Sequence, residues 1–376
     1  MTRKALIVGL GISGIAAAIG LKKQGWDLTI IEKTPERRTG GYFIGLREDG
    51  KQAARTLGAL QFMPNRTPAN AQFWDIDKNG SRKAIRDITN ESNAPLLLLR
   101  GDIEESLWKA LGNQVEVRFN TVPVSILNNP NGVSVGMRTG EEDERTEDFD
   151  LLIGADGVRS TVRRLCFGED DQFLKPVGTS LCAFPLSGQL TGFKHGEGII
   201  IAETGRSLTV FPLADRPPTA LFSYRRQGQA IGGNKLPAEE LRKIFEGLDH
   251  SGIISSVLDD LSDTQDYVFD SVNRVKMSAW SDRRVVLLGD SAWCLTLYSG
   301  MGASAGMMGA VALATAIEAY PEDLTKALAH YENAMRPFVK KHQRFIALRS
   351  QLFVPSSPAF MVLRKLLWKI LTKFSG

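Results

Sequence analysis

The N-terminal segment alternates apolar runs and glycines in the order expected of a strand, a helix and a second strand. Aliphatic and β-branched residues at 5–8 precede a glycine-rich turn, an alanine-rich segment ends near Gly25, and the run LTIIE follows at 28–32. This pattern predicts a βαβ unit. Two later apolar runs, DLLIGADG at 150–157 and RRVVLLGD at 283–290, predict two further strands.

The middle of the chain has a different pattern of apolar and polar residues. Between residues 176 and 270 the segments EGIIIAE, SLTVFPLA and TALFSYRRQ are alternating or β-rich, which predicts a separate antiparallel sheet. Helical periodicity returns after Gly302 and continues almost to the C-terminus. The pattern as a whole predicts an α/β protein with an inserted sheet and C-terminal helices.

Charge and cysteine content narrow the function classes. The net charge is +4, and nine of the 46 Lys and Arg residues follow Asn333, where there is no Asp or Glu. A nucleic-acid-binding protein would carry its basic face on the folded body, so we expect no nucleic-acid partner. The scattered Cys166, Cys182 and Cys294 predict neither a disulfide framework nor a metal site. With no run of about 18 apolar residues, we expect a cytoplasmic protein.

The glycine-rich turn has the spacing of a dinucleotide-binding fingerprint. Gly9 permits a sharp turn, Gly11 leaves room for a pyrophosphate, and Gly14 allows close helix–strand packing. Glu32, at the end of the second strand, is placed to accept hydrogen bonds from a ribose. The alternative is a glycine-rich turn without a ligand, but the strand–turn–helix–strand context favours dinucleotide binding and a Rossmann-like domain.

Three further segments resemble one protein family. The segments are DGVRSTVR at 156–163, RVVLLGDSAW at 284–293 and LLRGDIEESL at 98–107. Together with the fingerprint, they are similar in type and order to motifs of the FAD-dependent aromatic hydroxylases, the group typified by p-hydroxybenzoate hydroxylase. Segments 277–300 and 330–345 look most like the branch of tetracycline-inactivating monooxygenases and polyketide hydroxylases.

The resemblance implies a domain arrangement and a set of FAD-binding residues. It implies a GR2-type flavoprotein hydroxylase fold, with a discontinuous FAD-binding domain at 1–70, 96–175 and 271–325, a substrate-binding sheet domain at 71–95 and 176–270, and C-terminal helices at 326–376. The implied FAD-binding residues are Gly9, Gly11, Ile12, Ser13, Gly14, Glu32, Lys33, Arg38, Gly41, Tyr42, Arg100, Asp156, Gly157, Gly289, Asp290, Gly300, Met301, Gly302, Ala303 and Ser304.

Two of these assignments have plain structural alternatives. By resemblance Asp290 would bind the ribityl chain of FAD, and the glycines of YSGMGASAG would bring a helix N-terminus against the flavin; Asp290 could instead cap a helix. Arg37 or Arg38 could bind phosphate or could belong to a solvated basic turn. Relatives usually carry different residues at four positions of this stretch: Trp293, Leu297, Met301 and Ser304.

The implied reaction uses few protein side chains. FAD is reduced by NADPH or NADH and reacts with O2 to form a flavin hydroperoxide, which hydroxylates an extended aromatic or polycyclic molecule; no catalytic residue is assigned. The substrate would lie between the flavin and the second sheet. The candidate lining residues are Phe211, Phe222, Tyr224 and Leu297, with core packing as the alternative for the aromatic ones.

Two other functions remain open at this stage. One is a non-oxygenating flavin reductase or dehydrogenase, suggested by Leu297 and Met301, and the other is a non-catalytic flavin-containing binding protein. We expect a monomer. Residues 359–374 predict an amphipathic basic helix, started by Pro355 and Pro358. We expect this helix to dock on the protein rather than to lie on an anionic membrane.

Overall fold

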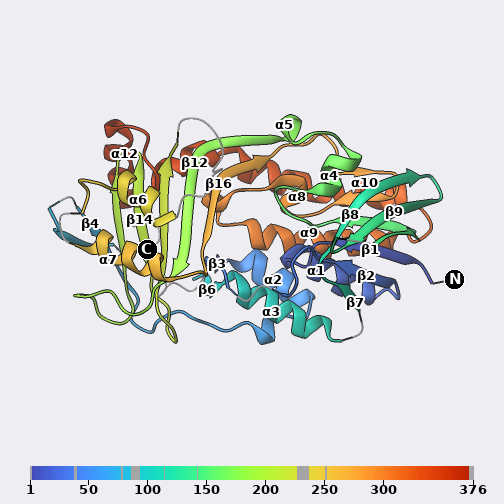
Figure 1. Cartoon of the computed structure of the whole chain (residues 1–376), viewed down its shortest axis with the longest axis horizontal. Helices are drawn as coiled ribbons and strands as arrows, with labels where there is room; N and C mark the ends of the chain where they lie inside the picture. Colours follow the sequence, from blue (N-terminus) through green and yellow to red (C-terminus); the bar gives the residue numbers. More distant parts are fainter. Residues whose placement is uncertain are drawn as a thin grey trace.

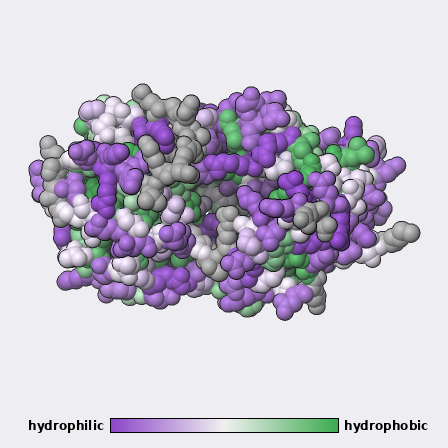
Figure 2. Space-filling view, viewed as in Figure 1, coloured by the Kyte–Doolittle hydropathy of each residue, from purple (hydrophilic) through white to green (hydrophobic). Residues whose placement is uncertain are grey.

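The computed structural model describes residues 2–37, 40–77, 79–85, 94–113, 115–141, 143–226, 237–249 and 252–371, with backbone only at 143 and 365–371. The described strands form sheets of six, three, seven and two strands. In Figure 1 the seven-stranded sheet with α6, α7 and α12 lies toward one end of an elongated molecule, and β1, β2 and α1 lie toward the other. Hydrophilic side chains cover most of the face shown in Figure 2.

The six-stranded sheet contains the βαβ unit. Its strands, in spatial order, are β17 (Ser281–Asp282), β18 (Val285–Leu287), β11 (Leu151–Gly154), β1 (Lys4–Val8), β2 (Asp27–Ile31) and β7 (Glu116–Arg118). β1 pairs in parallel with both β2 and β11, and β11 pairs in parallel with β18. The apolar runs at 150–157 and 283–290 therefore join the same buried parallel sheet as the N-terminal unit, which confirms the predicted α/β fold class.

Two helices pack closely against each other beside this sheet. The helices are α1 (Ile12–Lys22) and α9 (Gly302–Ala319). A Cβ at Gly20 would lie 2.7 Å from Ala314 Cβ, so Gly20 permits this close approach. Among the described residues, α9 is the single helix that is long and apolar enough to cross a membrane, although the sequence analysis expected no such run. Of this helix, 56% is buried within the protein.

The seven-stranded sheet is mixed rather than antiparallel throughout. In spatial order it contains β16 (Val268–Val275), β12 (Leu174–Pro185), β15 (Thr219–Arg225), β14 (Arg206–Phe211), β13 (Glu197–Glu203), β4 (Gln72–Ile76) and β5 (Arg82–Ile85). β4 pairs in parallel with β13, while the other neighbours are antiparallel. The strands β12 to β16 are thus antiparallel to one another, as predicted for residues 176–270, and β4 joins them from a distant segment in the direction of β13.

Two helices that the sequence pattern did not predict cover one face of this sheet. They are α6 (Pro237–Ile244) and α7 (Ile253–Asp263). Their apolar residues join Phe184, Phe222 and Tyr224 in a second hydrophobic core, separate from the core around β1 and α9. Residues 176–270 are therefore a sheet with its own helical cover, because a sheet face of this size needs apolar cover to exclude water.

The remaining elements lie around and between these two parts. They are β3 (Phe43–Leu46), α2 (Glu48–Thr56), a 3₁₀ turn (Leu60–Phe62), β6 (Leu96–Leu99), α3 (Arg100–Leu111), β8 (Thr121–Asn129), β9 (Gly132–Thr139), β10 (Asp143–Phe149), α4 (Thr161–Cys166), α5 (Asp170–Phe173), α8 (Asp290–Trp293), a second 3₁₀ turn (Leu297–Ser299), α10 (Leu324–Arg344), α11 (Ile346–Phe353) and α12 (Pro358–Leu371). β3 pairs with β6, and β9 lies between β8 and β10.

The C-terminal helices are fixed by specific polar contacts. Glu332 and Arg336 form an i, i+4 ion pair on α10, and the buried Tyr331 hydroxyl donates to the Leu287 carbonyl at 2.9 Å. α12 begins at Pro358, as the sequence predicted. Its Arg364 is 3% exposed and donates to the Leu352 carbonyl at 2.9 Å. The apolar and lysine side chains from 365 onward, on which the amphipathic pattern mostly rests, lie outside the described side chains.

Candidate functional site

The turn between β1 and α1 combines tight packing with one open position. Gly9 has φ +104°, and a Cβ there would lie 2.5 Å from the Ala155 carbonyl oxygen; a Cβ at Gly14 would lie 1.9 Å from the Gly9 oxygen. At Gly11 the nearest atoms to a Cβ would be side-chain ends of Arg100 and Glu104, each at 3.5 Å. Two glycines therefore shape the turn, and the third leaves room beside it.

The start of α1 offers free backbone donors to that room. Gly11 is the N-cap residue and no described side chain caps the helix, so the first N–H groups at Ile12, Ser13 and Gly14 are available. A helix N-terminus with open backbone favours a phosphate group. The side chain of Ile12 is buried in the core, and that of Ser13 lies against Gly289, so their contribution here is through the backbone.

Glu32 lies beside the glycine turn, as the fingerprint predicts. Its Oε2 accepts a hydrogen bond from the Leu10 N–H at 2.9 Å, and its Oε1 accepts from the Thr34 N–H and hydroxyl, each at 3.0 Å. These contacts hold the carboxylate at the carboxyl end of β2, where a dinucleotide ribose would be bound. The next residue, Lys33, is exposed, and Arg38 lies outside the described residues.

Arg37 does not serve as a free phosphate ligand. Its guanidinium donates to Glu105 at 2.5 Å and lies over the Trp108 ring, 4.6 Å from the ring centroid. Both partners are on α3, so Arg37 fastens the loop after β2 to that helix. The sequence left two alternatives for Arg37, a solvated basic turn or a phosphate contact. Its contacts with Glu105 and Trp108 match neither of them.

Arg100 connects three parts of the site. It starts α3, pairs with Glu104 at 2.6 Å, and lies so close to Gly41 that a Cβ there would be 2.8 Å from Arg100 Cβ. Its backbone N–H donates to the Tyr42 carbonyl at 3.0 Å. Burial raises the pKa of Tyr42 to about 12, and the charge of Arg100 opposes that rise. Gly41, Tyr42 and Arg100 are therefore brought together, and Tyr42 is a neutral phenol at neutral pH.

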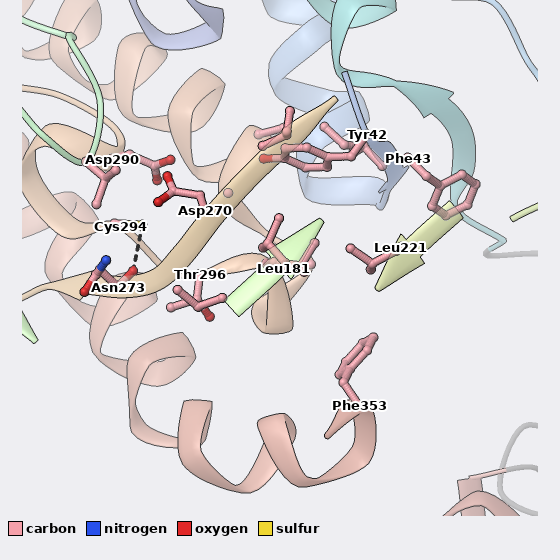
Figure 3. A pocket seen from close by; sticks show the side chains of 18 of the residues that line it. Tyr42, Phe43, Leu181, Leu221, Asp270, Asn273, Asp290, Cys294, Thr296 and Phe353 are labelled. Atoms are coloured by element: carbon pink, nitrogen blue, oxygen red, sulfur yellow. Dashed lines mark hydrogen bonds between the residues drawn. The ribbon is translucent and has the colours of Figure 1, made fainter. Parts of the chain in front are cut away.

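Asp290 faces a cavity between the two large sheets. The cavity has a volume of about 320 Å³, and Figure 3 shows Asp290 and Cys294 on one side of it, with Tyr42, Phe43 and Leu221 on the other. The Asp290 side chain is open to the cavity but lies deep in the protein, and this burial raises its pKa, opposed by the Cys294 thiol and by Arg100. No described N–H donates a capping hydrogen bond to its carboxylate, so the helix-cap alternative is not what the structure shows.

The start of α9 forms the neighbouring wall of the cavity. Gly300, Gly302 and Ala303 line it, and a Cβ at Gly302 or Gly300 would meet nothing within 4 Å. No described side chain caps α9, so its first N–H groups face an open space where negative charge is favoured. The side chains of Met301 and Ser304 are 3% and 1% exposed and do not line the cavity.

Asp156 and Gly157 lie one layer away from the cavity. Asp156 Oδ2 accepts from the Thr161 and Val162 N–H groups and so caps α4, and the Gly157 N–H donates to the Ser291 hydroxyl at 3.0 Å. The segment therefore positions the residue next to Asp290. The Asp156 carboxylate is therefore held at this helix start, and its contact with a cofactor stays a prediction; Val158 lines the cavity.

The second sheet supplies the apolar wall of the cavity. Phe211 lines it and is stacked on Phe43 with ring centroids 4.2 Å apart; Leu297 also lines it. Phe222 and Tyr224 are 0% and 2% exposed and belong to the core under α6 and α7, with the Tyr224 hydroxyl donating to Glu240 at 2.8 Å. Their expected place in the cavity is corrected, because successive strand residues face opposite sides; the alternate β15 residues Thr219 and Leu221 line it.

Several cavity residues were missed by the sequence analysis. Most of them come from segments without a motif; Val158, Cys294 and Thr296 lie within segments that resemble the family, at positions to which the resemblance assigned no role. The full described lining is Tyr42, Phe43, Ile44, Gly45, Val158, Leu181, Phe211, Thr219, Leu221, Val268, Asp270, Ser271, Val272, Asn273, Asp290, Cys294, Thr296, Leu297, Gly300, Gly302, Ala303 and Phe353. Trp293, another departure from the family pattern, is 1% exposed and packs on Trp280 with ring centroids 4.6 Å apart.

The structure combines a glycine turn, a glutamate at the end of β2, an aspartate and a second open helix start on a mostly parallel sheet beside an apolar sheet, an arrangement that fits the flavoprotein hydroxylases. The chain belongs to the family described as "FAD binding domain", which matches residues 2–345. This confirms the resemblance found in the sequence. The open turn at Gly11 and the uncapped start of α9 fit FAD, since both would contact its negatively charged or electron-rich parts.

Relatives of established type align over nearly the whole chain. A flavin-dependent monooxygenase of Legionella longbeachae is 27% identical over 359 residues, 93% of this chain and 90% of the relative. The FAD-dependent monooxygenase asL4 of Sarocladium schorii is 27% identical, over 94% and 89% of the two chains. The crystal structure of tetracycline destructase Tet(51) superposes with a TM-score of 0.79 and 26% identity, covering 100% of this chain and 98% of that one.

Proposed function

We propose that the protein is an FAD-dependent monooxygenase that uses NADPH or NADH and O2 to hydroxylate an extended aromatic or polycyclic small molecule. The observation that carries this proposal is the composition of the cavity walls. One wall holds Asp290 and the open start of α9, and the other is an apolar sheet face with the stacked pair Phe43 and Phe211. Such a cavity has a place for a cofactor ring on one side and for an aromatic substrate on the other.

The cofactor and the walls of the cavity contribute different parts of the proposed reaction. When bound, FAD supplies the redox chemistry. The chain supplies N–H groups at the start of α9 that favour negative charge on a ring beside them, and Asp290 supplies acceptors for hydroxyl groups. The apolar wall excludes water and orients an aromatic ring. None of the described lining residues is a histidine, so no acid–base pair is assigned.

The relatives support the same reaction class. The chain covers nine-tenths of proteins that are named flavin-dependent monooxygenases and almost all of a tetracycline destructase. We take from them an oxygen-dependent reaction and a polycyclic substrate. We also propose that the protein acts in the cytoplasm as a monomer, with NADPH or NADH binding transiently.

A non-oxygenating reductase or dehydrogenase is the second candidate. Leu297 lines the cavity at a position where the resembled family usually has proline, and this observation favours it. A branched side chain replaces a rigid ring beside the place where O2 would react. A third candidate, a flavin-containing binding protein without turnover, requires only the cofactor site.

Oxygen uptake separates these functions. The FAD-loaded protein is mixed with NADPH or NADH and a panel of polycyclic phenols and tetracyclines, and oxygen consumption and product mass are followed under ¹⁸O2. A monooxygenase consumes O2 in a substrate-dependent manner and adds one ¹⁸O atom to the product. Turnover that continues without O2 identifies the reductase, and a yellow protein that does not oxidise NADPH or NADH identifies the binding protein; either outcome refutes our proposal.

A further inference from the structure

Thr296 combines three features that are individually unusual. It lies in the turn after α8 with φ +63° and ψ 158°, it lines the cavity, and its buried hydroxyl has no hydrogen-bond partner in the described structure. The residue is 7% exposed. Among described residues other than glycine, only Asn120 and Arg283 also have positive φ, and neither is β-branched or lines the cavity.

Both the backbone and the hydroxyl of Thr296 cost stability. A β-branched residue at positive φ is an outlier, and this combination of angles is adopted essentially by glycine. A buried hydroxyl without a partner loses its hydrogen bonds to water and gains none in return. Glycine would relieve the strain and valine would remove the unpaired hydroxyl. A residue that carries both costs in a cavity wall points to a function in that cavity.

The charges around the cavity restrict what that function can be. The described lining residues include no Lys, Arg or His. Asp290 belongs to the cofactor side, and Asp270 is neutralised by Arg159, which pairs with both of its oxygens. The charge of Arg100 reaches Tyr42 and Asp290, but Arg100 is itself paired with Glu104, so a carboxylate buried against the described lining would have no free cationic partner, which is costly. The cavity therefore suits an uncharged molecule.

We propose that the cavity takes an uncharged polycyclic aromatic bearing a phenolic or enolic hydroxyl, and that Thr296 hydrogen-bonds this oxygen. The proposal rests on the proposed function and specifies its substrate class. Since no described partner holds the Thr296 hydroxyl, rotation about its Cα–Cβ bond exchanges hydroxyl and methyl without breaking a hydrogen bond. Figure 3 shows the side chain between Asn273 and Leu181, where a polar strip of the wall meets its apolar part.

Binding to the FAD-loaded protein, without NADPH or NADH, tests the substrate class. Three probes share one ring system: 2-naphthol, naphthalene and 2-naphthoate. The change in flavin absorbance on titration gives each Kd. We expect 2-naphthol to bind about 10-fold or more tightly than 2-naphthoate, because only the carboxylate must be buried as an unpaired charge. Equal or tighter binding of 2-naphthoate, or no binding of neutral phenols with two to four fused rings, overturns the proposal.

Two variants test Thr296 itself. Thr296→Val keeps the branched shape and removes the hydroxyl, so we expect the Kd for 2-naphthol to rise about 3- to 10-fold while that for naphthalene stays unchanged. The same variant should melt about 2–4 °C higher, because the unpaired buried hydroxyl is gone. Thr296→Ser keeps the hydroxyl and should retain 2-naphthol binding. A purely structural role would not produce higher stability together with weaker phenol binding.

Each remaining outcome has a defined meaning. Unchanged 2-naphthol affinity in Thr296→Val overturns the role of the hydroxyl. Loss of FAD affinity with retained phenol binding assigns the hydroxyl to the cofactor and also overturns the proposal. Because these titrations involve no turnover, they can fail while substrate-dependent oxygen uptake is still observed, and oxygen uptake can fail while they succeed.

Discussion

Gly11 and Gly14 belong to the same turn, but the structure predicts opposite consequences for their replacement by alanine. At Gly14 the new Cβ would lie 1.9 Å from the Gly9 carbonyl oxygen, so the helix must move away from the strand. Overpacking of this kind costs about 1–3 kcal/mol. At Gly11 the nearest atoms would be flexible side-chain ends at 3.5 Å, and φ is −87°, which alanine adopts readily.

We therefore expect Gly11→Ala to fold normally and to bind FAD poorly. Its methyl group would occupy the room left for the pyrophosphate, and its loss of stability should stay below about 1 kcal/mol, the cost of alanine at a helix N-cap. Gly14→Ala should lower the melting temperature of the FAD-free protein by about 1–2 °C for each kcal/mol lost, given the entropy of unfolding of a chain of 376 residues. Thermal melts of the FAD-free variants and titration of each with FAD measure the two effects separately.

Two results would contradict the predicted difference between Gly11→Ala and Gly14→Ala. If Gly11→Ala melts as low as Gly14→Ala, the room beside Gly11 is not free in the folded protein. If Gly11→Ala binds FAD as tightly as the unaltered protein does, the pyrophosphate does not approach this position, and the turn is only a structural feature.

Three more predictions concern other parts of the structure. Asp290→Asn should lower FAD retention, yet the FAD-free variant should melt at a higher temperature than the unaltered protein near neutral pH. Burial raises the folded-state pKa of Asp290, so ionisation of Asp290 destabilises the folded protein as pH rises. Melting curves measured over a range of pH should show that the difference disappears in acid. Tyr224→Phe should cost about 1 kcal/mol by breaking its bond to Glu240 without changing substrate Kd, whereas Phe211→Ala should weaken substrate binding; the reverse pattern would place the wrong face of the sheet in the cavity. Truncation after Ser357, or Arg364→Met, should lower the melting temperature in plain buffer, while unchanged melting with lost sedimentation on anionic vesicles would identify a membrane helix instead.

Short sequence patterns were sufficient to locate the turn and the helix starts that we propose bind the cofactor. The Gly9–Gly14 turn, Glu32, Arg100, Asp290 and the start of α9 are each marked by local residue spacing, because a tight turn or an open helix start needs particular residues within a few positions. The motifs also identified the family. They did not reveal that Asp156 acts one layer behind the cavity, since a carboxylate that caps a helix and one that touches a ligand look alike in sequence.

The other wall of the cavity depends on how distant segments pack. Strand alternation told us that neighbouring residues of β15 face opposite sides, but the choice between Phe222 and Leu221 depends on where α6 and α7 lie, and these helices were not predicted. Likewise, Thr296 lies in a family-like segment, but no residue spacing predicts its positive φ or its unpaired buried hydroxyl, which depend on the surrounding packing. Local residue spacing fixes backbone shape at a turn, whereas the surroundings of a side chain are set by parts of the chain that are far away in sequence and adjacent in the folded protein.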